Sequence, residues 1–127
     1  MGISGAGGHI RPLGGLELSA WIFMRVSGVV LLFMALIHLA VMHIINNVDV
    51  IDYAFVARRY ALPFWRIYDW LMLSLALLHG FNGARVLVDD YFRPGGRRTT
   101  TLAVLYLLAF VIYILGSYTI LTFVPKV

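Results

Sequence analysis

LAVLYLLAFVIYILGSYTILTFV, residues 102–124, is a run of 23 residues without a charged side chain. A helix needs about 20 mostly apolar residues to cross a bilayer, so this run predicts a transmembrane helix. The run VSGVVLLFMALIHLAVMHIINNV at 26–48 is equally long and uncharged, and a shorter charge-free stretch covers residues 70–84. The sequence therefore predicts an all-α membrane protein with three transmembrane helices, at about 22–45, 64–89 and 101–124.

The composition excludes an ordinary soluble enzyme. Of the 127 residues, 61% are hydrophobic and 13% are charged, and the mean hydropathy is +0.89. Soluble domains are nearer half apolar and a quarter charged, and so short a chain cannot bury this much apolar surface in its own core. The chain has no cysteine, which excludes disulfides, iron–sulfur ligation and covalently attached haem within it. Iron could bind only through histidine.

The segments outside the spans predict the organisation of the chain. The glycine-rich start predicts a flexible or interfacial N-terminal tail over 1–20, with no cleavable signal peptide, before a three-helix membrane anchor over 21–125. Residues 46–69 predict an interfacial loop with a short amphipathic helix, and 91–98 predict a turn. Cations on the side of the N-terminus and that turn outnumber those on the other side by six to four, which places the N-terminus in the cytoplasm. No basic face gathers the arginines, so nucleic acid is not an expected partner.

Two histidines, His38 and His79, lie within the predicted spans. Ionisable groups in a span are costly and generally face a bundle interior, a partner or a cofactor. Gly83 follows His79 by one helical turn, where a missing side chain would let a flat group approach. Histidine is a common axial ligand of haem iron, so this pair is a candidate porphyrin contact. The alternative is a histidine hydrogen-bonded to a neighbouring helix, beside a glycine that allows close packing.

Asp90 and Tyr91 form a candidate polar site at the membrane surface. Asp90 follows His79 by eleven residues, which returns it to nearly the same face about 16 Å further along the helix axis. The tyrosine could donate a hydrogen bond to a small carbonyl headgroup, and the aspartate could orient that group or pass protons. The alternative is an ordinary polar helix end with an interfacial aromatic residue.

Arg25 and Ser27 enter the first span from the same predicted side as Asp90. Arg25 could bind a haem propionate or a quinone carbonyl, or it could be a boundary arginine whose head reaches the membrane surface. Ser27 and His38 are eleven residues apart and share a face, so His38 is either a second ligand or an interhelical hydrogen-bonding group. Arg85 is close enough in sequence to reach a propionate or the lipid headgroups.

Three stretches carry a family resemblance: HGFNGARVLVDDY at 79–91, WIFMRVSGVVLLFMALIHL at 21–39 and IDYAFVARRYALPFWRIYDW at 51–70. They resemble the hydrophobic membrane anchor subunits of succinate dehydrogenase (respiratory complex II), specifically the D-type partner. The resemblance implies half of a haem-binding bundle in a prokaryotic cytoplasmic membrane, completed by a C-type anchor. It also implies an iron–sulfur subunit and a flavoprotein with FAD as partners, electron transfer to quinone in the respiratory chain and tricarboxylic acid cycle, and possible trimers of whole complexes.

Residue by residue, the resemblance implies that His79 ligates haem b and that Asp90 and Tyr91 lie beside the quinone. Many D-type subunits of single-haem complexes lack a histidine in the first span, whereas this chain has His38. In this respect the chain resembles the class whose anchors hold two b haems, and that class generally works with menaquinone. In that case His38 would ligate a second haem, with the opposing ligands in the partner anchor. RVSG at 25–28 is also similar to part of a C-type motif in which a serine and an arginine contact quinone. Arg25 is retained here, whereas Trp21 occupies the position of the motif's leading serine.

Other functions remain open on the sequence alone. One alternative is a purely structural anchor, in which His38 and His79 could be replaced without loss of a visible chromophore. Another is the equivalent subunit of a quinol:fumarate reductase. A small transporter or assembly factor could use the histidines for protons. A transporter, however, would more often show internal repeats or broken helices, and the sequence shows neither.

Overall fold

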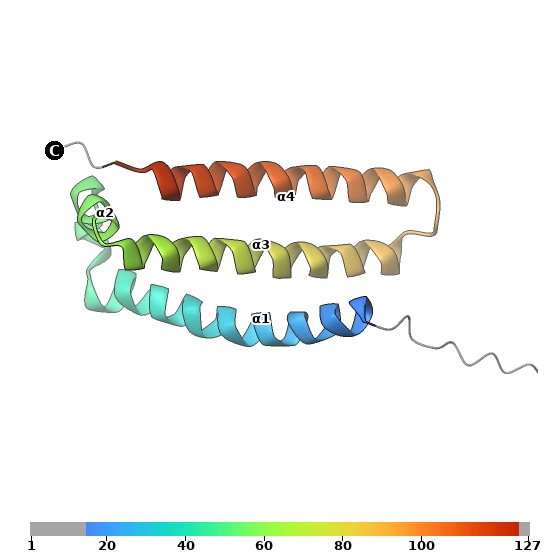
Figure 1. Ribbon diagram of the computed structural model, residues 1–127, viewed down its shortest axis with the longest axis horizontal. Helices are drawn as coiled ribbons and strands as arrows, with labels where there is room; N and C mark the ends of the chain where they lie inside the picture. The colour runs from blue at the N-terminus through green and yellow to red at the C-terminus, as the bar shows by residue number, and fades with distance from the viewer. Residues whose placement is uncertain (1–14, 125–127) are drawn as a thin grey trace, which may run out of the picture.

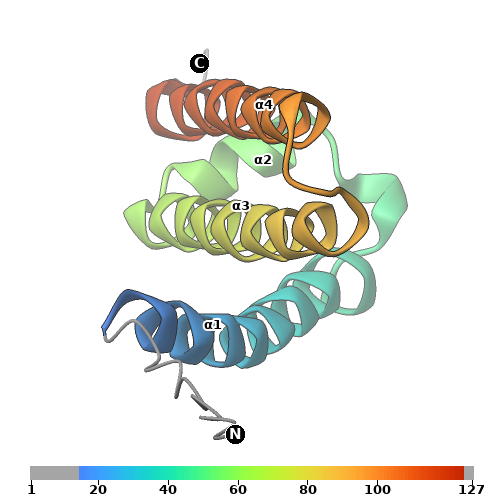
Figure 2. The same ribbon diagram turned by 90° about the vertical axis from the view of Figure 1, so that its right-hand side faces the viewer.

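The computed structural model describes residues 15–124, and the regular structure in this range is helical. Three long helices lie side by side in Figure 1, and Figure 2 shows from the end that they form one layer. They are α1 (Leu16–Leu39), α3 (Pro63–Tyr91) and α4 (Gly96–Thr122), with α3 in the middle, packed against both others. A short helix, α2 (Tyr53–Tyr60), lies at one end of the layer. The all-α prediction is confirmed.

The first helix begins earlier than the sequence predicted. Residues 16–20, which we assigned to the N-terminal tail, already belong to α1. The helix starts where the run of glycines ends: Gly15 has a φ of 105°, and its carbonyl accepts a hydrogen bond of 2.7 Å from the Ser19 hydroxyl. The rest of the predicted tail, residues 1–14, and the predicted end of the anchor at residue 125 lie outside the described residues.

The first span continues beyond α1 into a π-helix, η1 (Ala40–Ile45). Asn46 ends it, because its side-chain amide donates to the Val41 carbonyl at 2.6 Å and its backbone N–H donates to the same carbonyl at 3.3 Å. The continuous apolar segment runs over Leu18–Ile45, which agrees with the predicted end of the first span.

The predicted interfacial segment contains a 3-10 turn, η2 (Val48–Val50), and α2. Asp52 caps α2 by accepting a hydrogen bond from the Phe55 backbone N–H at 2.8 Å, and Pro63 occupies the first position of α3, where its missing N–H costs nothing. These local signals explain why the short helix and α3 begin where they do.

The third span also begins earlier than predicted, at residue 96 instead of 101. Two hydroxyl groups support this extra turn: Thr99 donates to the Gly95 carbonyl at 3.3 Å and Thr101 donates to the Arg97 carbonyl at 2.9 Å. The helix therefore extends past the apolar run into the polar residues that precede it. A charge-free window in the sequence marks the hydrocarbon core and not the ends of the helix.

Polar side chains occupy the buried positions of this layer. Among the side chains described, only Ser27 (2% exposed) and Arg59 (7%) are buried, while many large apolar side chains are exposed. This arrangement suits a hydrocarbon environment, where polar groups need partners inside the protein and apolar groups do not need to be hidden. Three helices are long and apolar enough to cross a membrane: Leu18–Ile45, Pro63–Tyr91 and Gly96–Thr122. The three predicted spans are thus confirmed.

Arg66 joins the ends of three helices. Its guanidinium donates to the carbonyls of Leu121 at 3.2 Å and Phe123 at 2.6 Å, and its Nε donates to the carbonyl of Tyr60 at 2.6 Å. The last carbonyls of a helix have no donor within that helix, and a cation beside them also interacts favourably with the helix dipole.

Replacing Arg66 with alanine is expected to lower the free energy of unfolding by about 2 kcal/mol, because three carbonyls lose a charged donor. Thermal unfolding of the detergent-purified protein measures this loss. Arg58→Ala is the matched control, since Arg58 is exposed and forms no hydrogen bond within residues 15–124. Equal losses in the two variants would contradict the role of Arg66.

Candidate functional site

His79 lies in the middle of α3 and is held by α1. Its Nδ1 atom is 2.9 Å from the hydroxyl oxygen of Ser27. Gly28 lies against the same ring, because a Cβ atom at this glycine would come within 3.1 Å of His79 Cε1. Within residues 15–124, Nε2 of His79 forms no hydrogen bond. One ring nitrogen is fixed and the other is free, which is the arrangement that an axial haem ligand requires.

Gly83 contacts α1 as well. A Cβ atom at Gly83 would lie 3.7 Å from the terminal methyl of Met24, in ordinary van der Waals contact. The close approach that we expected for a porphyrin is therefore an approach of α1 in this structure. The hydrogen bond of His79 and the packing of Gly83 are what we expect if the two residues serve helix packing. The free Nε2 atom is what we expect if His79 ligates haem iron.

His38 lies at a different depth in the membrane. Ser27 is level with His79, and His38 follows Ser27 by eleven residues, so the two histidines are about 16 Å apart along the helix axis. The side chain of His38 is half-buried, and its imidazole forms no hydrogen bond within the described residues. It lines a hollow of about 390 Å³ together with residues of α2, α3 and α4, namely Tyr60, Asp69, Met72, Leu73, Ala76 and Ile120.

Asp90 and Tyr91 lie at the opposite end of α3 from this hollow. They follow His79 by eleven and twelve residues, which puts them about 16 Å from it along the axis. Tyr91 is 83% exposed. Asp90 is also exposed and forms no ion pair within residues 15–124. The nearby Arg98 pairs instead with Asp89, at 2.6 Å. Both side chains are therefore accessible to a ligand from the membrane surface.

The two arginines predicted to surround a cofactor are exposed. The guanidinium carbon of Arg25 lies 3.4 Å from the centre of the Trp21 ring, on the surface of α1. Arg85 forms no hydrogen bond or ion pair in the part of the chain described. The structure thus brings Ser27 and His79 together. It leaves Arg25 and Arg85 at the surface, where neither forms a hydrogen bond with His38 or His79.

A charged cluster that the sequence did not reveal lies near His38. Arg59 of α2 and Asp69 of α3 form an ion pair of 2.8 Å, with side-chain exposures of 5% and 12%. The Arg59 guanidinium also lies 4.3 Å from the centre of the Trp65 ring. Burial, followed by the negative charge of Asp69, raises the pKa of Tyr60 to about 12. Tyr60 therefore stays a neutral phenol to a higher pH than an exposed tyrosine does.

Arg59 is one of the four cations that the sequence places on the side opposite the N-terminus, and the structure buries it. The signal that could have found the pair is Asp69, an acid that lies inside the predicted second span. An acid within a span needs a partner, and Arg59 is ten residues away in sequence. Gly28 was missed for another reason: its importance depends on how α1 packs against α3, which no local pattern specifies.

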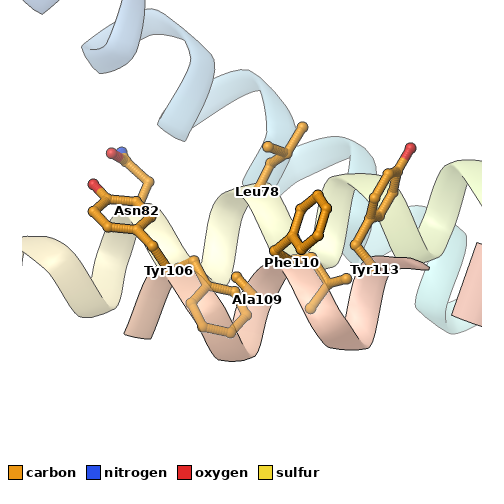
Figure 3. Close-up of a pocket in the computed structure, with 8 residues that line it drawn as sticks. Leu78, Asn82, Tyr106, Ala109, Phe110 and Tyr113 are labelled. Atoms are coloured by element: carbon orange, nitrogen blue, oxygen red, sulfur yellow. The ribbon is translucent and has the colours of Figure 1, made fainter. Parts of the chain in front are cut away.

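A second hollow, of about 470 Å³, lies between α3 and α4 (Figure 3). It is lined by Leu77, Leu78, Phe81, Asn82, Tyr106, Ala109, Phe110 and Tyr113. None of the predicted site residues is among these. At about 100° per residue, Leu78 and Asn82 lie on the opposite side of α3 from Asp69 and Ala76, which line the hollow near His38. The two hollows therefore open on different faces of the layer.

Comparison with known proteins shows the family of this chain. Residues 9–116 match the family described as succinate dehydrogenase/fumarate reductase transmembrane subunit. The chain is also 30% identical, over 97 residues, to a protein of Archaeoglobus fulgidus named succinate dehydrogenase hydrophobic membrane anchor subunit; the match covers 76% of this chain and 81% of that relative. The family match includes the first two spans and most of the third. The chain therefore belongs to the family of succinate dehydrogenase/fumarate reductase transmembrane subunits, and it is an integral membrane protein.

Proposed function

We propose that this chain is the membrane anchor and cytochrome b subunit of a succinate dehydrogenase, passing electrons from an iron–sulfur subunit to a quinone. The observation that carries the proposal is His79, an imidazole in the middle of a span with Nδ1 held by Ser27 and Nε2 free. Family membership supports the anchor role. Haem b, when bound, supplies a one-electron carrier within the membrane.

Among residues 15–124, His79 is the one histidine at its depth, because His38 is about 16 Å away along the axis and His43 lies further still. A haem with two histidine ligands would therefore take its opposing ligand from another chain, which we propose to be a C-type anchor. His38, half-buried beside a hollow, would ligate a second haem in the same way. Two haems at these depths would match the two-haem class, and menaquinone is the quinone which that resemblance implies.

We place the quinone beside Asp90 and Tyr91, at the membrane surface that the cation count assigns to the cytoplasm. Both side chains are exposed at the end of α3, where water can deliver protons. Tyr91 would donate a hydrogen bond to a quinone carbonyl, and Asp90 would supply or relay a proton. The iron–sulfur subunit and the FAD-containing flavoprotein, which oxidises succinate, would dock on this side of a prokaryotic cytoplasmic membrane.

Asp90→Asn is expected to lower succinate:quinone reductase activity by about 100-fold, the usual contribution of a positioned acid or base. Succinate oxidation with a soluble dye as acceptor should be unchanged, because that reaction needs the flavoprotein alone. Asp89→Asn is the matched control: it removes the pair with Arg98 but leaves Asp90, so quinone reduction should persist. Normal quinone reduction in Asp90→Asn would exclude this residue from the quinone site.

Two other functions have specific support. The contacts of His79 with Ser27 and of Gly83 with Met24 would also suit a purely structural anchor, which would hold the soluble subunits without haem. The matched family includes fumarate reductase subunits, so the complex could instead reduce fumarate with electrons from quinol. The direction is tested by comparing succinate oxidation with fumarate reduction in the purified complex.

A further inference from the structure

Ser27 is the most deeply buried side chain among those described, at 2% exposed. Its hydroxyl oxygen has two polar neighbours: the Met24 carbonyl, at 3.4 Å on the same helix, and Nδ1 of His79, at 2.9 Å on α3. The site lies within two spans, where no bulk water competes for these groups. Ser27 therefore satisfies its hydrogen bonds through these two contacts.

The direction of the Ser27–His79 hydrogen bond decides which ring nitrogen can bind a metal. A serine hydroxyl has one proton to donate and lone pairs to accept with. When the proton is donated to the Met24 carbonyl, the oxygen accepts Nδ1–H of His79, and Nε2 carries no proton. When the proton is donated to Nδ1, a proton must sit on Nε2 and block a bond to iron.

Gly28 controls how closely the ring can approach α1. A Cβ atom at this position would lie 3.1 Å from His79 Cε1, which is tighter than an ordinary contact, so a larger residue would have to displace the ring. Ser27 and Gly28 together hold one nitrogen and the adjacent carbon of the imidazole. We call these two residues the Ser27–Gly28 clamp.

We propose that the Ser27–Gly28 clamp positions His79 as an iron ligand: Ser27 accepts Nδ1–H and selects the form with a free Nε2, and Gly28 admits the ring against α1. The inference rests on the proposed function, because it requires haem iron at His79. Ser27 is a positioning residue, since it contacts the ligand and not the haem.

Loss of this hydrogen bond has a definite sign. An imidazole that donates Nδ1–H is a more basic ligand, which favours ferric over ferrous iron and strengthens binding. In the purified complex, Ser27→Ala should therefore shift the haem midpoint potential to more positive values. Transfer of haem to excess apomyoglobin should become about 10- to 100-fold faster. Ser27→Thr keeps a hydroxyl and should restore both quantities towards the wild-type values.

A matched pair of glycine variants tests the second half of the clamp. Gly28→Ala should change the potential and the haem-transfer rate in the same direction as Ser27→Ala. Gly80→Ala makes the same chemical change on α3 at a position where a Cβ atom meets nothing within 4 Å, so it should behave as wild type. Equal effects of the two glycine substitutions would remove Gly28 from the proposal.

The controls separate failure of the clamp from failure of the proposed function. Wild-type potential and haem-transfer rate in Ser27→Ala, in a complex that still loses one b-type haem per flavin in His79→Ala, would overturn the clamp alone. A full b-type absorption in His79→Ala would overturn both, because His79 would then hold no haem. Neither readout depends on turnover of succinate or quinone.

Discussion

Replacing Arg59 with alanine is expected to lower the free energy of unfolding by about 3–5 kcal/mol. The reason is the state in which the substitution leaves Asp69. This carboxylate is 12% exposed and has Arg59 as its ion-pair partner at 2.8 Å, so removal of the guanidinium leaves a nearly buried, uncompensated charge. Thermal unfolding of the detergent-purified complex, followed by circular dichroism, measures the loss.

The double variant distinguishes the pair from simple loss of side-chain packing. Arg59→Leu combined with Asp69→Leu should recover most of the stability, because removing both members of a buried pair is often neutral or stabilising. Arg58→Ala changes the neighbouring arginine, which is exposed, and should have little effect. If Arg59→Ala is no more harmful than Arg58→Ala, the ion pair does not hold α2 against α3.

The three spans could be predicted from the sequence because exclusion of charge over about 20 residues has almost no other cause. The starts of the first and third helices could not, since the backbone gains hydrogen bonds wherever it stays helical, whether or not lipid surrounds it. Residues 16–20 and 96–100 were accordingly assigned outside the spans and are helical. Local hydroxyl and glycine signals at Ser19 and Gly15 explain one of these ends only once the helix is seen.

The site was predicted residue by residue but not as a set of contacts. The cost of an ionisable group in a span singled out His79 and His38. That Ser27 faces His79, and that Met24 faces Gly83, depends on the register between α1 and α3, which is fixed by packing across distant parts of the chain. The Arg59–Asp69 pair was missed for a related reason: Asp69 lies inside the predicted second span and needs a partner, but which cation meets it depends on how α2 packs against α3.

His79→Ala is the substitution with the largest expected effect on the proposed function. Methyl replaces the imidazole, so no nitrogen remains at this depth of the chain to bind iron, and His38 is about 16 Å too far along the axis to substitute. Haem at this site should be lost completely, and not merely altered in potential as in Ser27→Ala. His43→Ala is the control, because His43 is exposed near the end of the first span.

Haem binding through His79 is measured by the difference spectrum of the purified complex, dithionite-reduced minus air-oxidised, with haem counted per flavin. We expect a b-type absorption in wild type and in His43→Ala, and loss of one haem per flavin in His79→Ala. Loss of a further haem in His38→Ala would support the second ligand, and an unchanged count would leave His38 to packing. A wild-type complex without b-type absorption, or an undiminished count in His79→Ala, would contradict the claim that this chain binds haem through His79.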